Sequence, residues 1–537
     1  MTFAGATAAA CVSSLSGSSA SAAPVSKQSD SPNVLFIIAD DLRPELGCYG
    51  QAHIISPNID AIAADGMRFT HSYVQDAVSA ASRASFLTGC RPVTTGVQYP
   101  YSEYFVNEFL PSHATVQRHF FNNGYYVRTL GKVHHGLAEN FTEKHFGEGG
   151  KSYALPQNQA LAKDKVNRLP FEFADVPEEE YADGGMARET IATIGRAKAS
   201  GKPFFIAAGF LKPHLPWVAP KKYWDMYEGR QLPECPWPEP TVGEMPWSRS
   251  HVNLVTYKGE TDAGGHVVST PYAQQLRRAY FSCVTFVDTQ VGLIIAELKK
   301  QGLYDNTVIL LIGDHGWHLG DNGMWGKQTN FERATFSPLI VKGVKAEHGK
   351  GKVCDRFVEY VDIYPTFCQL AGLEVPGFLE GASFAPLLSN NTQSWKRAAF
   401  SEFPRGGNAY GYTVRTDRYR YTEWRKSRFS TEVVGRELYD HSTDPLESHN
   451  IAAKNSKKCA ELSVILNQGW RGSLPSGVVN ASNNKVAPPA VGWGPEAAAK
   501  KDQQKGGNNN KKAKPKNTAL DSMQSLIDEE IALNTNN

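Results

Sequence analysis

The chain has 537 residues, of which 41% are hydrophobic and 20% charged, so it is long enough to bury a large core and to form more than one domain. Its 56 basic and 54 acidic residues leave a net charge of only +2, which argues against a protein that binds nucleic acid or an anionic membrane. Its eight cysteines include no Cys-X-X-Cys pair, so neither a zinc finger nor a disulfide scaffold is indicated.

Residues 1–30 form a leader rich in Ala and Ser. The leader has no charge before Lys27 and contains Ala20-Ser21-Ala22, which is typical of the cleavage region of a secretory signal, although the usual positive segment in front is missing. A disordered leader would have the same composition. No later run approaches the ~18 consecutive apolar residues of a membrane span. We therefore expect an exported protein without a membrane span.

Three uninterrupted apolar runs predict strands that are buried on both faces of a parallel sheet. They are residues 33–39 (NVLFIIA), 203–210 (PFFIAAGF) and 306–313 (NTVILLIG). Polar sequences follow each run directly: DD, LKPHLPW and DHGWHLGDNG. Because ligands of open α/β sheets bind outside the carboxyl ends of the strands, we expect the three junctions to meet at one site.

Helical patterns separate these strands. The clearest covers residues 271–300, with Thr270-Pro271 at its start and Gly302 just after its end, and shorter helices are indicated after Pro57 and before Gly124. This alternation predicts that residues 31–390 form an α/β domain with a large, mostly parallel central sheet flanked by helices.

The pattern changes in the last third of the chain. Residues 391–483 contain short strand-like runs, such as GYTVRTDRYRYTEW, followed by a helical pattern around residues 462–470. We expect a smaller C-terminal α+β subdomain with a short antiparallel sheet. Residues 484–537 are too polar and repetitive to bury a core, which predicts a disordered tail.

Two adjacent carboxylates, Asp40 and Asp41, end the first predicted strand. They would repel each other there unless a cation compensates them, although one of them could instead cap a helix or pair with Arg43. Asp314 and His315 end the strand 306–313 in the same way. This oxygen-rich set suits a hard divalent cation, and we expect Ca²⁺, with His315 as the least typical ligand.

Lysine and histidine residues follow the other predicted strand ends. They are Lys132 and His135 in GKVHHG, Lys212 and His214 in LKPHLP, and Lys327 in MWGKQTN. Each alone could be an ordinary core or surface residue. Their shared position predicts a cationic pocket that would neutralise a tetrahedral oxyanion, in which a histidine could protonate a leaving oxygen.

Residues 79–83 read SAASR, a run of small residues that ends in Arg83. Taken alone, the run could be a serine-rich helix cap. It also fits the sulfatase maturation motif, which is Cys or Ser, any residue, Pro or Ala, any residue, then Arg, and SFLTG continues that signature. Together with NVLFIIADDLRPELGCYG, SPNID, LGKVHHG, KPHLPW, DTQVG, DHGWHLGDNGMWGKQTNFERAT and ELYDHSTDPLESHN, it resembles the type I sulfatases of the alkaline-phosphatase-like superfamily, nearest to the iduronate 2-sulfatase group. These blocks span residues 33–451.

The resemblance implies a sulfuric ester hydrolase that uses a formylglycine made from Ser79 by a serine-type maturase. It implies a calcium site with the ligands Asp40, Asp41, Ser79, Asp314 and His315. It also implies that Arg83 holds the formylglycine and the metal environment, that Lys132, His135 and Lys327 contact the formylglycine or the sulfate, and that His214 protonates the departing alkoxide.

Two positions depart from the family pattern. Cys90 and then Arg91 follow LTG, where the family usually has Arg directly. Ser79 and Ala81 stand where the iduronate-type enzymes have Cys and Pro. Either the chain is a serine-type bacterial sulfatase, periplasmic or secreted, or Ser79 marks an engineered inactive variant, and the sequence leaves both open.

The resemblance favours a sulfated, uronate-containing polysaccharide or its oligosaccharides as substrate, with sulfated algal polysaccharides as rivals. We expect Lys212, Arg405 and Arg415 to bind a sugar carboxylate, and Trp217 and Trp317 to form apolar walls for a sugar ring. Two other functions remain open. One is a phosphomonoesterase or phosphodiesterase with two zinc ions on the same scaffold, and the other is a non-catalytic glycan-binding protein in which Ser79 stays unmodified.

Overall fold

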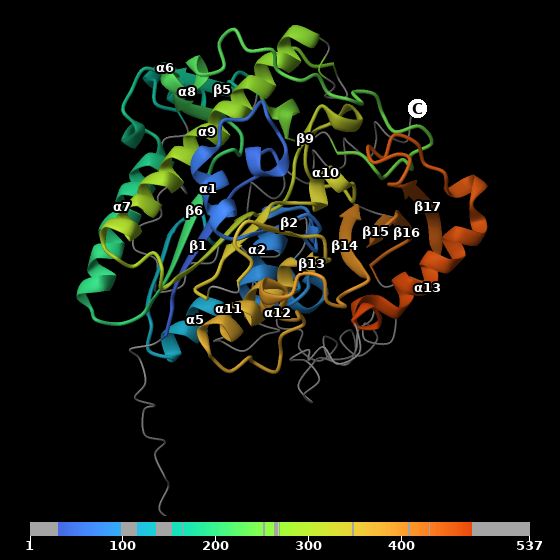
Figure 1. Ribbon diagram of the computed structural model, residues 1–537. Helices are drawn as coiled ribbons and strands as arrows, with labels where there is room; N and C mark the ends of the chain where they lie inside the picture. The colour runs from blue at the N-terminus through green and yellow to red at the C-terminus, as the bar shows by residue number, and fades with distance from the viewer. Residues whose placement is uncertain are drawn as a thin grey trace, which may run out of the picture.

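The computed structural model describes residues 31–97, 115–135, 153–164, 166–250, 253–262, 267, 269–345, 348–405, 409–428 and 430–474. Over these residues the chain forms a large α/β unit with helices on both faces of a central sheet, and a smaller sheet stands beside it (Figure 1). The predicted leader, residues 1–30, and the predicted tail, residues 484–537, lie outside the described residues.

The central sheet has seven strands in the order β12-β2-β11-β8-β1-β6-β4. The four strands β4 (Tyr126–Gly131), β6 (Phe204–Phe210), β1 (Asn33–Ala39) and β8 (Thr307–Gly313) are mutually parallel. Strand β11 (Leu339–Lys342) runs antiparallel to both β8 and β2 (Met67–Phe69), and β12 (Lys352–Cys354) pairs in parallel with β2. The sheet is therefore mostly parallel, as predicted.

Two hydrophobic cores lie on opposite faces of this sheet. Leu35 and Ile37 of β1 pack into the core that includes α1 (Pro57–Asp65), α7 (Ala182–Ala199) and α9 (Thr270–Lys300). Val34 and Phe36 pack into the other core with α2 (Ser79–Thr88), α5 (Val116–Asn122), α11 (Ile363–Ala371) and α12 (Ala385–Ser389). Burial on both faces explains why β1 is apolar throughout.

The long helix α9 confirms the prediction for residues 271–300. Its N-terminus is capped by Ser269, whose side chain accepts a hydrogen bond from the N–H of Tyr272. By length and composition α9 could cross a membrane, but 78% of its most apolar window is buried inside the protein. That burial is expected of the main core helix of an α/β unit.

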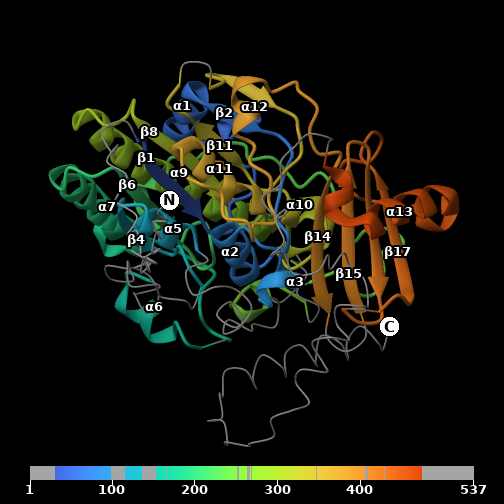
Figure 2. The ribbon, with the colours of Figure 1, turned by 90° about the horizontal axis from the view of Figure 1, so that it is seen from below.

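The smaller sheet is antiparallel in the order β14-β15-β16-β17. Its strands are β14 (Ala398–Arg405), β15 (Ala409–Thr416), β16 (Tyr419–Arg425) and β17 (Val433–Asp440). Helix α13 (Ser456–Ser473) packs against it through Leu462, Leu466 and Trp470. Figure 2 shows this sheet beside the α/β unit. The strand-like runs and the helical pattern predicted for this region are confirmed.

Shorter elements complete the described chain. The remaining strands are β3 (Ser72–Tyr73), β5 (Phe171–Ala174), β7 (Trp217–Pro220), β9 (His318–Leu319), β10 (Trp325–Gly326) and β13 (Val358–Glu359). The remaining α-helices are α3 (Pro92–Thr95), α6 (Pro156–Leu161), α8 (Lys221–Asp225) and α10 (Glu332–Thr335). The 3₁₀ turns are η1 (Gly47–Tyr49), η3 (Glu178–Glu180), η4 (Leu254–Thr256), η5 (Asp321–Gly323), η6 (Tyr360–Asp362) and η7 (Ala452–Lys454).

Candidate active site

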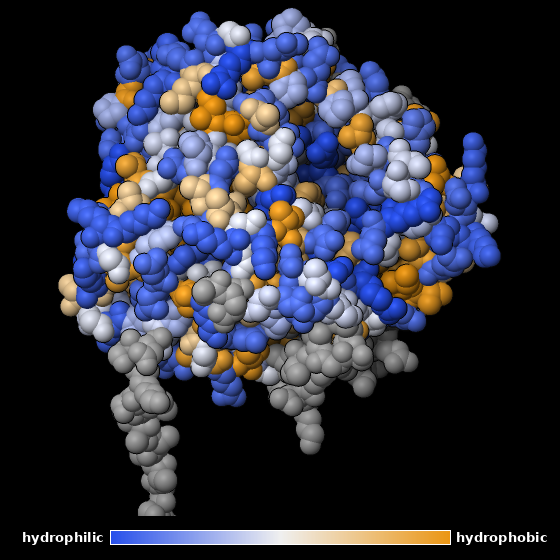
Figure 3. All heavy atoms as spheres, viewed as in Figure 1, coloured by the Kyte–Doolittle hydropathy of each residue, from blue (hydrophilic) through white to orange (hydrophobic). Residues whose placement is uncertain are grey.

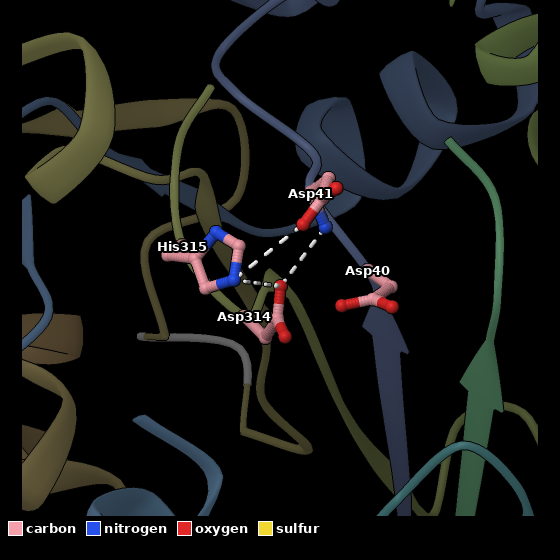
Figure 4. A group of neighbouring side chains, drawn as sticks. All are labelled: Asp40, Asp41, Asp314 and His315. Carbon is pink, nitrogen blue, oxygen red and sulfur yellow. Dashed lines mark hydrogen bonds and ion pairs between the residues drawn. The ribbon is translucent and has the colours of Figure 1, made fainter. Parts of the chain in front are cut away.

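The carboxyl ends of β1 and β8 bring four polar residues together. Ala39 and Gly313 are paired in the parallel register, so Asp40 and Asp41 follow one strand exactly where Asp314 and His315 follow its neighbour. Asp41 adopts a left-handed backbone with φ of 63°, and its N–H donates to Oδ1 of Asp314 at 2.9 Å. One ligand atom from each of the four residues lies within 4.8 Å of those of the others (Figure 4).

The chemistry of this cluster fits a divalent cation. All four side chains are buried, and Oδ2 of Asp41 has no hydrogen-bond partner. Burial raises the pKa of Asp41 to about 7 and that of Asp314 to about 6, and the neighbouring Asp40 carboxylate adds to both shifts. A bound cation would compensate the negative charges of the carboxylates, and they would therefore stay ionised.

The imidazole of His315 is oriented as a metal ligand would be. Its Nδ1 lies 3.0 Å from the Gly316 carbonyl oxygen, to which it can donate. In that tautomer the lone pair of Nε2 faces the carboxylates, and Nε2 lies 3.5 Å from both Asp41 Oδ1 and Asp314 Oδ1.

Ser79 is the first residue of α2 and faces the same cluster. Its hydroxyl donates to Asp40 Oδ1 at 3.0 Å, and its Oγ lies 3.1 Å from His315 Nε2. The free N–H groups of the first turn of α2 favour an anion near this position. Val78, and not a serine, occupies the N-cap position, so Ser79 is not needed as a helix cap.

Arg83, one turn along α2, connects this helix to both strand ends. Its guanidinium is 1% exposed and donates to Asp314 Oδ2 at 3.1 Å and to Asp40 Oδ1 at 3.4 Å. It also donates to the backbone carbonyl of Lys132. One buried cation thus ties α2 to the ends of β1, β4 and β8.

Two lysines flank the cluster, one beside each residue of the Asp40-Asp41 pair. Lys132 donates to Asp40 Oδ2, and Lys327 donates to Asp41 Oδ1 at 2.6 Å and to Ser79 Oγ at 3.3 Å. Burial by itself would raise the pKa of Asp40, but Lys132 and the other nearby cations outweigh burial and hold that pKa well below its usual range. The pocket therefore carries fixed positive charge next to Ser79.

The two predicted histidines lie near this charge, which favours their neutral forms. Nε2 of His214 is 3.9 Å from Asp41 Oδ2, and burial, reinforced by Lys327, holds the pKa of His214 well below its usual range. Burial and the neighbouring Lys132 lower the pKa of His135 to about 3. Both imidazoles can hydrogen-bond to a substrate without adding charge.

Lys212 supports the loop that carries His214. Its ammonium donates to the backbone carbonyls of His214 at 2.5 Å and Pro216 at 2.6 Å. The backbone N–H of Lys212 donates to the buried carboxylate of Asp183. These bonds fix the loop after β6. The predicted contact of Lys212 with a sugar stays a prediction.

The structure corrects the predicted sugar walls. Trp217 and Trp317 are 0% and 1% exposed, because both are part of the core, where their ring centroids lie 6.5 Å apart. Neither ring has a face open to a sugar. A position near a strand end in the sequence does not determine whether a tryptophan ring points into the core or into the site.

The two predicted arginines are engaged away from the metal cluster. Arg415 on β15 forms an ion pair with Glu332 at 3.1 Å and is 4% exposed. Arg405 at the end of β14 donates to the backbone carbonyl of Trp247 at 2.6 Å. Arg415 is therefore already neutralised, which argues against its predicted role in binding a carboxylate, and the role of Arg405 stays a prediction.

Two residues shape the site although neither is among the predicted site residues. Gln328, next to Lys327, has a left-handed backbone with φ of 68°, and its N–H donates to the carbonyl of Ala77, two residues before Ser79. Arg91, displaced by one position through Cys90, reaches Glu359 Oε2 at 2.8 Å and so anchors the segment after α2. Side-chain chemistry alone predicts neither contact.

Comparison with known proteins connects this geometry to a family. Residues 32–373 match the Sulfatase family, and residues 320–468 match the family described as N-sulphoglucosamine sulphohydrolase, C-terminal. The chain is 32% identical to human iduronate 2-sulfatase over 517 residues, which covers 79% of this chain and 91% of the human protein.

Solved structures of more distant relatives share the fold. Phosphonate monoester hydrolase of Agrobacterium radiobacter has a TM-score of 0.67 at 24% identity, covering 82% of this chain and 95% of that chain. A protein solved in complex with its substrate D-glucosamine-2-N,6-O-disulfate has a TM-score of 0.66 at 21% identity, covering 82% and 98%. At these identities the likeness concerns the alkaline-phosphatase-like fold alone.

Proposed function

This chain belongs to the sulfatase family and is a sulfuric ester hydrolase, and we propose that it removes sulfate from a carbohydrate by means of a formylglycine made from Ser79 and a calcium ion. The observation that carries this proposal is the position of the Ser79 hydroxyl, 3.0 Å from Asp40 and 3.3 Å from Lys327 in a buried cluster of carboxylates.

The residues around Ser79 support distinct tasks. Asp40, Asp41, Asp314 and His315 would hold Ca²⁺, which would polarise the sulfate oxygens, and the hydrated formylglycine would supply the attacking oxygen. Lys132 and Lys327 would neutralise the sulfate from two sides, while Arg83 keeps α2 in register with the strand ends. His214 would deliver a proton to the departing sugar oxygen, which requires that the negative charge of the bound substrate raise its lowered pKa.

Phosphoester hydrolysis with two zinc ions is less well supported. Among the described residues two groups could hold a metal, and the second, Glu332 with His441 and Glu447, is already neutralised by Arg415 and Arg420. One cluster therefore remains for a metal next to Ser79. The phosphonate hydrolase neighbour shares the fold but does not by itself favour this reading.

The carbohydrate is proposed to be a sulfated, uronate-containing polysaccharide or its oligosaccharides. Human iduronate 2-sulfatase, which covers most of the chain at 32% identity, supports this class. Because residue 79 is Ser, we propose maturation by a serine-type formylglycine maturase. The Ala/Ser-rich leader supports export to the periplasm or the medium of a bacterium.

The maturation of Ser79 gives the decisive test. Co-expression with a serine-type maturase should convert Ser79 to formylglycine, which mass spectrometry of the peptide around residue 79 detects as a loss of two hydrogens. The matured protein should release free sulfate from sulfated oligosaccharides, and Ser79→Ala should release none while keeping its thermal stability. Unchanged activity in Ser79→Ala would refute the nucleophile, and a Ser79 that stays unmodified beside the maturase, with no sulfate released, would favour the glycan-binding alternative.

A further inference from the structure

Among the residues that the structure describes, Arg168 is a cation without an anionic partner. Its Nε donates to the carbonyl of Thr256 at 2.6 Å, and one terminal nitrogen donates to the Thr256 hydroxyl. Its guanidinium carbon lies 4.0 Å from the centre of the Tyr257 ring. No carboxylate within the described part of the chain forms an ion pair with it. In contrast, Lys132, Lys327 and Arg415 all have carboxylate partners.

The segment that holds Arg168 adjoins the catalytic pocket. Thr256 ends η4, and the Thr256 hydroxyl donates to the carbonyl of Asn253. Asn253 packs against Gly326, the residue before Lys327, so closely that a Cβ on Gly326 would come within 2.6 Å of Asn253 Nδ2. A short chain of contacts therefore joins the Arg168 guanidinium to the segment of the catalytic lysine.

Electrostatics places Tyr257 near the metal cluster as well. Burial raises the pKa of the Tyr257 phenol to about 12, and among the smaller contributions Arg168 and Lys327 lower it while Asp41 raises it. The phenol thus lies within the electrostatic range of both the metal ligands and the catalytic lysine. Figure 3 shows a hollow lined by hydrophilic residues on the face where Figure 1 shows β9 and α10.

One donor on Asn253 and one on Arg168 lack an acceptor in the described part of the chain. Nδ2 of Asn253 is buried without a hydrogen-bond partner, and the second terminal nitrogen of Arg168 has none among the described residues. The Thr256 bonds and the Tyr257 ring restrict the guanidinium to one orientation, which lowers the entropy lost when it binds a ligand. A planar carboxylate matches the remaining edge of a guanidinium in shape and charge.

We propose that Arg168, held by Tyr257 and flanked by Asn253, binds a second anionic group of the substrate, the carboxylate of a sugar, while Lys132 and Lys327 hold the sulfate. This inference rests on the proposed function. It assigns the carboxylate contact to a residue that the sequence did not indicate, in place of Arg415, which Glu332 already neutralises.

Binding to the unmatured protein tests the proposal, because a protein that retains Ser79 cannot turn substrate over. Isothermal titration in calcium buffer would compare a 2-O-sulfated hexuronate disaccharide with the same disaccharide reduced at the carboxyl group. We expect Arg168→Gln to weaken binding of the hexuronate roughly 10- to 100-fold and to leave binding of the reduced sugar within about twofold. Arg168→Lys should lose less.

Arg230→Gln is the matched control, because Arg230 also stacks on a tyrosine, Tyr227, at 5.9 Å, but lines a separate cavity with Trp224 and His53. It should bind both sugars as the wild type does. An equal loss for both sugars in Arg168→Gln would indicate a structural role and overturn the proposal, as would no loss for either.

Further outcomes separate this proposal from the proposed function. If the loss appears only with a neutral disaccharide that carries a second sulfate, the anion is sulfate and the carboxylate assignment is wrong. If the matured wild type releases no sulfate from any sugar, the proposed function fails, whatever Arg168 binds. If it releases sulfate but Arg168→Gln binds the hexuronate as the wild type does, only the Arg168 subsite fails.

Discussion

At the scale of one residue, Lys327 both compensates a buried carboxylate and lies next to the proposed reaction centre. Its ammonium is 4% exposed and lies between Asp41 and Ser79. The adjacent Gln328 holds the segment in a left-handed turn against Ala77. The charge that would bind sulfate is therefore the same charge that compensates a buried carboxylate.

Replacing Lys327 with Ala should lower kcat roughly 100- to 1000-fold, because a preorganised cation next to the transferred group is lost. It should also lower the melting temperature without calcium, since Asp41 keeps no direct cation, and added calcium should restore part of that loss. Steady-state assays and thermal melts with and without calcium measure both effects. Lys350→Ala is the control, because the Lys350 side chain is 74% exposed and pairs with Asp65 at the surface. Wild-type kcat in Lys327→Ala would remove Lys327 from the catalytic set.

At the scale of elements, the contact of β4 with β6 positions Lys132. Gly131 and Gly209 face each other in the parallel register, and the N–H of Lys132 donates to the Gly209 carbonyl at 2.8 Å. A Cβ on Gly209 would lie 2.1 Å from the Lys132 carbonyl oxygen. The strands can approach this closely only because residue 209 has no side chain.

Gly209→Ala should therefore push the Lys132 backbone away from β6 and destabilise the protein by about 1–3 kcal/mol. The Lys132 carbonyl accepts from Arg83, and the Lys132 ammonium pairs with Asp40. Activity should therefore fall by more than the loss of folded protein accounts for. Gly195→Ala is the control, since Gly195 lies within α7 with nothing near its notional Cβ and should gain about 1 kcal/mol. Urea unfolding and sulfate release distinguish the two variants. Equal behaviour of both would contradict the packing argument.

The strands and the main helix could be predicted because their signal is local. Residues 33–39 are apolar without interruption and form β1 with the same bounds, and the paired register of β1 and β8 follows from two such runs in one parallel sheet. The surroundings of single side chains could not be predicted in the same way. Trp217 turns into the core, and Arg168 is fixed by Thr256, 88 residues later. Such contacts depend on how loops fold over the sheet, which periodicity does not encode.

At the scale of the whole molecule, the carboxylate cluster is built on the ends of two neighbouring strands of the central sheet. β1 and β8 are far apart in the sequence but hydrogen-bonded to each other, so the four side chains that could hold a metal come together only in the folded chain. Calcium that binds the folded protein and not the unfolded chain should raise the free energy of unfolding by about 2.7 kcal/mol at 100 times its Kd. Thermal melts at increasing calcium concentration measure this shift, and Asp314→Asn should weaken it. A calcium-independent melting temperature, or two tightly bound zinc ions by elemental analysis, would contradict the calcium assignment.

Glu332 joins the α/β unit to the C-terminal sheet. It begins α10, five residues after Lys327, and its carboxylate accepts from Arg415 of β15 at 3.1 Å, from Arg420 of β16 and from the Tyr73 hydroxyl at 2.7 Å. The two arginines outweigh the effect of burial and hold the pKa of Glu332 well below its usual range. A single ionised carboxylate thus pairs with two cations from the smaller sheet, of which Arg420 also pairs with Glu447.

Removing that charge should destabilise the contact between the two parts of the molecule. In Glu332→Gln the cations of Arg415 and Arg420 keep, within the described part of the chain, only Glu447 as a carboxylate partner, through Arg420, and the free energy of unfolding should fall by on the order of 3 kcal/mol. Glu432→Gln is the control, because Glu432 is 60% exposed in a surface pair with Lys426 and should change stability by less than about 0.5 kcal/mol. Urea unfolding followed by tryptophan fluorescence compares the two variants. If Glu332→Gln unfolds in two steps where the wild type unfolds in one, the carboxylate couples the smaller sheet to the α/β unit, whereas an unchanged transition would show that the other contacts between them, such as the bonds of Phe400 and Ser401 to Glu359 and Val74, are sufficient.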